Sequence, residues 1–151
     1  MVAPSIRYRS QLRRQLAGAE RAVAGRGTPK TLLWDAYQGE VVLYPCCLFH
    51  DVARHAGGDT LFRELTYTYE VTISREAIAA SPAEVVVGIE YDQGAEQYLD
   101  DLTRVIANTP AGRNNRIGLI PNYFASPARV GEHVQAMARV IHPEAFPGGS
   151  R

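Results

Sequence analysis

The chain has 151 residues, of which 46% are hydrophobic and 21% charged, and this composition is typical of one globular domain. The net charge of zero argues against free DNA binding as the main role. No apolar run reaches the roughly 20 residues that cross a bilayer, and the N-terminus lacks a signal-peptide core, so we expect no membrane partner. We expect a single domain over residues 1–142 and a frayed tail over residues 143–151.

The first third of the chain predicts a helix followed by a hairpin. Apolar residues recur at helical spacing from Leu12 to Val23, which predicts an N-terminal helix. Two extended runs, 31–36 and 40–49, flank a loop that contains glycine, and this spacing is typical of a hairpin. We expect residues 51–60 to form a loop.

A long alternating stretch follows, LTYTYEVTIS at residues 65–74. Its apolar and polar residues alternate with period two, and it is rich in threonine, tyrosine, valine and isoleucine, which favour strands. A strand of this kind has one dry and one solvated face. That property favours antiparallel pairing.

The second half predicts helices and strands in alternation. The expected elements are a short helix at 75–80, a buried strand at 84–91, a helix at 95–108, a short strand at 117–120 and a last helix that carries Val130 and Ile141. The whole order predicts an α+β fold, with a mainly antiparallel sheet and helices packed on one of its faces.

Charge is distributed unevenly along the chain. Residues 1–30 carry seven Arg or Lys and one Glu, whereas residues 51–110 carry eleven Asp or Glu and four Arg. This polarity suits copies that associate basic surface on acidic surface. The N-terminal arginines also leave a nucleic-acid-binding module open as an alternative function.

One short segment contains groups that could bind a metal. His50-Asp51 resembles the metal-binding dipeptide of HD-domain phosphohydrolases, and His55 adds a third potential ligand. The adjacent Cys46 and Cys47 point to opposite faces of a strand, so we expect neither a disulfide framework nor an ordinary zinc pair. A small metal-dependent hydrolase therefore stays an alternative, and we expect a protein that is not an enzyme and has no cofactor.

A resemblance to a known family rests on an arrangement over residues 5–75. Its features, in chain order, are the basic helix, Gln38-Gly39, the run 45–49, Arg63 and the run 67–73. This arrangement resembles the tail-terminator and neck proteins of tailed bacteriophages.

The resemblance implies a structural virion protein that assembles into a ring, usually of six copies, at the head–tail junction. Tail-tube and neck proteins would be its partners, DNA would pass through the ring, and the protein would be located in the virion and, during assembly, in the host cytoplasm. Candidate ring-interface residues are Arg9, Arg13, Tyr37, Tyr123 and Phe124. Candidate residues facing the DNA are Arg113 and Arg116.

Overall fold

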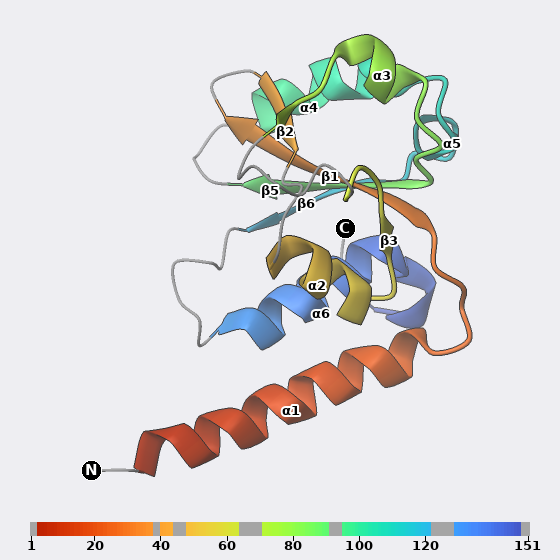
Figure 1. The fold of residues 1–151 in the computed structure, drawn as a ribbon. Coiled ribbons are helices and arrows are strands. Elements are labelled where there is room, and N and C mark those ends of the chain that lie inside the picture. The colour runs from red at the N-terminus through yellow and green to blue at the C-terminus, as the bar shows by residue number, and fades with distance from the viewer. Residues whose placement is uncertain are drawn as a thin grey trace.

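A mixed β-sheet with helices on both faces organises the chain (Figure 1). The computed structural model describes residues 3–37, 40–43, 48–63, 71–90, 95–121 and 129–148. The strands within these residues are β1 Lys30–Tyr37, β2 Glu40–Leu43, β3 Asp59–Thr60, β4 Val71–Thr72, β5 Val85–Glu90 and β6 Ile117–Pro121. In this described part of the chain the six strands form one sheet in the order β4-β2-β1-β5-β6, with β3 beside the start of β1.

The centre of the sheet is parallel. β1 pairs in parallel with β3 and β5, and β5 pairs in parallel with β6. Only β2 and β4, at one side of the sheet, run antiparallel to their neighbours. The prediction of a mainly antiparallel sheet is therefore wrong.

Burial explains the difference. Thr31 to Trp34 in β1 and Val85 to Ile89 in β5 are all buried, so both faces of these strands are covered, as is typical of parallel sheets. The alternating stretch 65–74, from which the antiparallel prediction came, lies largely outside the described residues. Its described strand portion is the two-residue edge strand β4.

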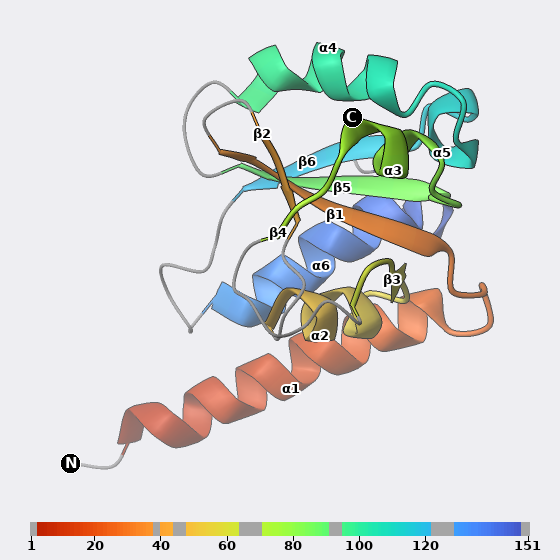
Figure 2. The same cartoon turned by 45° about the horizontal axis from the view of Figure 1, so that its top comes forward.

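Helices cover both faces of the sheet, and the prediction of helices on one face is also wrong (Figures 1 and 2). One face carries α1 Ala3–Val23, α2 Leu48–His55 and α6 Val130–Ile141, and the other carries α3 Arg75–Ala79, α4 Ala95–Val105 and α5 Pro110–Arg113. The chain is thus a three-layer α/β structure.

Each face of the sheet has its own hydrophobic core. Because side chains alternate along a strand, Leu33 and Val87 point toward α1, α2 and α6, whereas Trp34 and Val86 point toward α3, α4 and α5. The core around Leu33 and Val87, called the first core below, is covered mainly by α2 and α6. The core around Trp34 and Val86, the second core, is covered mainly by α4 and by Ile78 of α3.

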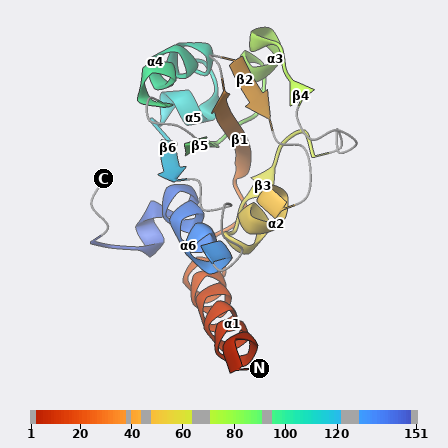
Figure 3. The same cartoon turned by 90° about the vertical axis from the view of Figure 1, so that its left-hand side faces the viewer.

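The N-terminal helix is confirmed, and its second half packs against α6 and α2. Ala19 and Val23 are buried against the first core, whereas Ile6 is 67% exposed. The first turns of α1 project past the other elements (Figures 1 and 3). Although α1 has 21 residues, it is too polar to cross a bilayer, and no other described helix has the length and apolarity to do so.

Helix α2 replaces the predicted strand end and loop over residues 48–55. Phe49, Val52 and Ala53 are buried at helical spacing against the first core, and Ala56 follows them. Burial of these apolar side chains against the first core stabilises a helix here rather than a strand and loop. The structure therefore places His50, Asp51 and His55 on a helix rather than in a loop.

At the C-terminal end, a 3-10 turn at Pro143–Ala145 follows α6. Phe146 packs against the first core, and Nε2 of His142 lies 3.1 Å from the carbonyl oxygen of Gly57. The expected domain limit at residue 142 and the frayed tail stay predictions.

Gly88 in β5 makes room for the buried Trp34. The two residues are register partners, and a Cβ at position 88 would lie 2.7 Å from the Trp34 ring and 2.5 Å from Leu119. We expect Gly88→Ala to lower the free energy of unfolding by about 1–3 kcal/mol, because the ring has no space to move. Urea denaturation measures this change. Gly18→Ala, in an open position of α1, is the matched control and is expected to be neutral or stabilising.

His133 of α6 is fully buried, with its ring edge-to-face against Phe49 at 6.0 Å. Burial lowers its pKa to about 4 from the ordinary 6.5. Between these values the unfolded chain binds the proton that the folded chain does not, so stability falls as the pH drops through this window.

We expect His133 to account for a loss of about 2 kcal/mol in the free energy of unfolding between pH 7 and pH 5. Urea denaturation of the wild type and of His133→Met at the two pH values measures how much of this loss is due to His133. The variant should lose less stability on acidification than the wild type. An equal loss in both proteins would contradict the assignment.

Candidate functional site

The parallel strands end together at one edge of the sheet. β1, β5 and β6 run in the same direction and finish at Tyr37, Glu90 and Pro121 (Figure 2). In open α/β sheets, ligands bind outside this carboxyl edge, because the loops that follow the strands gather there.

The connections diverge between β1 and β5. After β1 the chain passes through β2 to α2 on one face of the sheet, whereas after β5 it enters α4 on the other face. Such a divergence leaves a crevice between the two strand ends, and this is where ligands of such sheets are bound. The candidate site is therefore the carboxyl edge at β1 and β5.

The sequence supplies polar and aromatic residues directly after these strands. Tyr91 and Asp92 follow β5, and Tyr123 follows β6 after one residue. Sequence reasoning missed Tyr91 and Asp92 as candidates. The signal that could have found them is their position after the run Val85 to Ile89, the most strongly apolar and β-branched strand of the sequence. Residues 91–94 and 122–128 themselves lie outside the described residues.

The three candidate metal ligands on α2 are held in separate contacts. Nδ1 of His50 is hydrogen-bonded to the Thr60 hydroxyl, Asp51 pairs with Arg54 at 3.3 Å, and His55 pairs with Glu20 of α1 at 2.7 Å. Within the described ranges, no three His, Cys, Asp or Glu side chains form a group that could hold a metal ion. Cys46 and Cys47 lie outside those ranges.

The candidate interface residues do not form one described surface. Arg9 and Arg13 are exposed on α1. Tyr37 is the last residue of β1, and Tyr123 and Phe124 lie outside the described residues.

The two candidate DNA-facing arginines make contacts within the chain. Arg113 donates to the carbonyl of Asn108, and Arg116 donates to the carbonyl of Ile141. These contacts hold the turn after α5 and the end of α6. A role of either guanidinium toward DNA stays a prediction without support from this geometry.

Solved structures share this fold, whereas no protein-family model and no curated protein matches the sequence. The nickel–histidine complex of CeuE from Helicobacter pylori is 17% identical with a TM-score of 0.73, over 92% of this chain and 45% of that one. An ABC transporter substrate-binding protein from Listeria monocytogenes is 14% identical with a TM-score of 0.73, over 91% and 57%. A periplasmic heme-binding protein from Pseudomonas aeruginosa is 23% identical with a TM-score of 0.69, over 96% and 54%.

The chain thus spans about half the length of the proteins whose fold it shares. These neighbours are named as a nickel–histidine complex, a transporter substrate-binding protein and a heme-binding protein. At this identity the likeness shows the fold, and the expectation that this chain is not an enzyme stays a prediction.

The resemblance to phage tail-terminator and neck proteins is wrong, because the three-layer fold is that of solute-binding proteins. The ring at the head–tail junction, its tail-tube and neck partners and the location in a virion or host cytoplasm rested on that resemblance and are withdrawn with it. The basic segment 1–30 includes α1, whereas the acidic segment 51–110, which suggested stacked copies together with it, contributes to both faces of the sheet, through α2 on one and α3 and α4 on the other.

Proposed function

We propose that this chain is one lobe of a solute-binding protein that works outside the cytoplasm and serves an ABC importer. The observation that carries this proposal is the fold match, which takes in more than nine-tenths of the chain and about half of each neighbour. A match to about half of each neighbour supports a unit that is one part of a larger binding protein. The names of the neighbours, ABC transporter substrate-binding and periplasmic heme-binding, supply the transport role and the location.

The ligand is a metal chelate, with heme as the leading case. Two of the neighbours are named for a nickel–histidine complex and for heme. In the sequence, Tyr91 and Asp92 come directly after β5 and carry oxygen donors. A tyrosine oxygen is an established axial ligand of heme iron, and carboxylates suit hard cations.

The projecting part of α1 is consistent with contact to a second lobe. The first turns of α1 lie beyond the sheet layers, and Ile6 leaves a large apolar side chain exposed there. Five arginines and a single glutamate give this helix a basic character. A basic helix end of this kind is suited to meet an acidic surface of a further protein unit.

Heme titration of the purified chain tests the proposal. We expect saturable binding at one site per chain, seen as a shift of the heme absorption band, and at least about tenfold weaker binding in Tyr91→Phe. Tyr8→Phe is the matched control, because Tyr8 lies on α1 and follows no strand, and its affinity should equal that of the wild type.

Nickel with free histidine and ferric iron form parallel arms of the same titration. Specific binding of either one, weakened by Tyr91→Phe or Asp92→Asn, would identify the chelate. If none of the three ligands bound, or if Tyr8→Phe weakened binding as much as Tyr91→Phe did, the proposed site would be rejected.

A further inference from the structure

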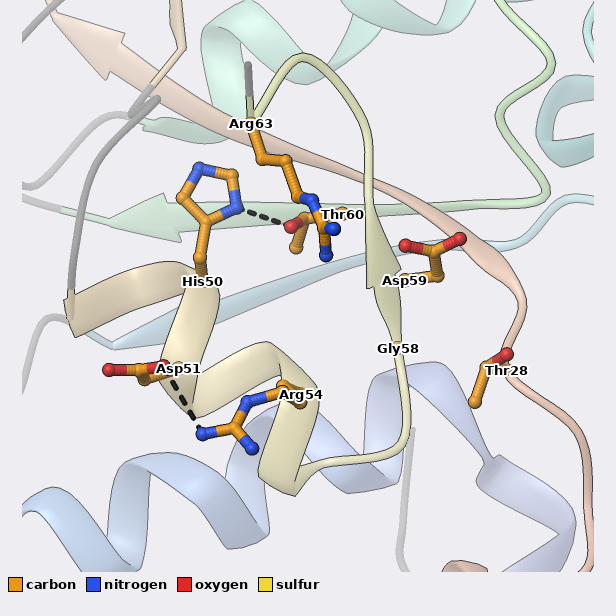
Figure 4. Close-up of a pocket in the computed structure, with 8 residues that line it drawn as sticks. All are labelled: Thr28, His50, Asp51, Arg54, Gly58, Asp59, Thr60 and Arg63. Atoms are coloured by element: carbon orange, nitrogen blue, oxygen red, sulfur yellow. Dashed lines mark hydrogen bonds and ion pairs between the residues drawn. The ribbon is translucent and has the colours of Figure 1, made fainter. Parts of the chain in front are cut away.

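A pocket of about 290 Å³ lies between α2, β3 and the turn after β3 (Figure 4). Its lining consists of Thr28, His50, Asp51, Arg54, Gly58, Asp59, Thr60 and Arg63. β3 pairs with Lys30 and Thr31, the first residues of β1, whereas the candidate solute site lies where β1 ends. The pocket is therefore separate from that site.

Tight backbone packing fixes the wall formed by β3. Gly57 has a φ of +83° after the end of α2, and a Cβ on Gly58 would lie 2.7 Å from the Thr31 hydroxyl. The amides of Gly58, Asp59 and Leu61 donate to backbone carbonyls at 2.8–3.0 Å. These three backbone donors are therefore already used within the fold.

Arg63 leaves the pocket with a spare positive charge. Asp59 is neutralised by Lys30, and Asp51 by Arg54. Across the part of the chain that the structure describes, Arg63 forms no ion pair, and its side chain reaches over Thr60 into the pocket (Figure 4). The pocket therefore attracts an anion.

Arg54 can supply a second guanidinium. Its ion pair with Asp51 joins side chains that are 68% and 65% exposed, and such a surface pair contributes little to stability. The pair uses one Nη of Arg54, at 3.3 Å from Asp51. The remaining N–H donors of the guanidinium can meet an oxyanion while Asp51 stays paired. On the same helix, the hydrogen bond to Thr60 of β3 fixes the His50 ring.

We propose that this pocket binds a small molecule through one oxyanionic group, a phosphate or a carboxylate, held between the guanidinium groups of Arg63 and Arg54. Guanidinium matches both groups with paired hydrogen bonds. The volume is at the lower end for ligand sites, which fits a small molecule.

Calorimetric titration of the intact chain at constant ionic strength tests this proposal, with inorganic phosphate in one arm and succinate in the other. We expect saturable binding of at least one of the two anions, and the arm with the tighter binding identifies the oxyanion. Arg63→Gln should weaken that binding at least tenfold, and Arg54→Gln should weaken it less. These residues are exposed, so neither change is expected to unfold the protein.

Arg104→Gln is the matched control, because Arg104 is an exposed arginine of α4 on the other face of the sheet. Its anion affinity should equal that of the wild type. The proposal is overturned if neither anion binds saturably, or if Arg63→Gln and Arg104→Gln bind as the wild type does. Heme binding by Arg63→Gln is measured alongside and should be unchanged, since the two sites are separate; joint loss of both ligands would overturn that separation.

Discussion

The parallel pairing of β1 with β5 is the constraint on which the rest of the structure depends. Residues 31–35 lie beside residues 85–89, and the described side chains of both segments are buried. Strands buried on both faces need a layer of helices on each side, which α2 and α6 supply on one face and α4 on the other. The same pairing brings the ends of the two strands to one edge, and so it also places the candidate site.

Local patterns in the sequence predicted much of the secondary structure. The helices over 95–105 and 130–141 and the strands at β1, β5 and β6 follow from helical spacing and from short β-branched runs. These patterns could not predict whether paired strands run parallel or antiparallel. Alternation within one strand does not indicate which other strand pairs with it. The fully buried run of β5 carried the better signal, since a strand with no polar face suits a parallel sheet.

The candidate site escaped sequence reasoning for a related reason. His50, Asp51 and His55 are close in sequence, yet on α2 each turns to a different partner. The ends of β1 and β5, Tyr37 and Glu90, are more than fifty positions apart in the sequence, and only the parallel pairing brings the two strand ends to one edge. Proximity along the chain was thus a poor guide to a shared site, because contacts between distant segments build the functional edge of an α/β sheet.

The position of Trp34 gives the molecule an intrinsic optical reporter. It is the only tryptophan of the chain, it is 1% exposed against Gly88, and its indole nitrogen has no hydrogen-bond partner within the described residues. An indole in such dry surroundings emits at short wavelength, and it lies three residues before the end of β1. Its emission therefore reports whether the junction of β1 and β5 is intact, and a light-absorbing ligand bound at the strand ends would quench it by energy transfer.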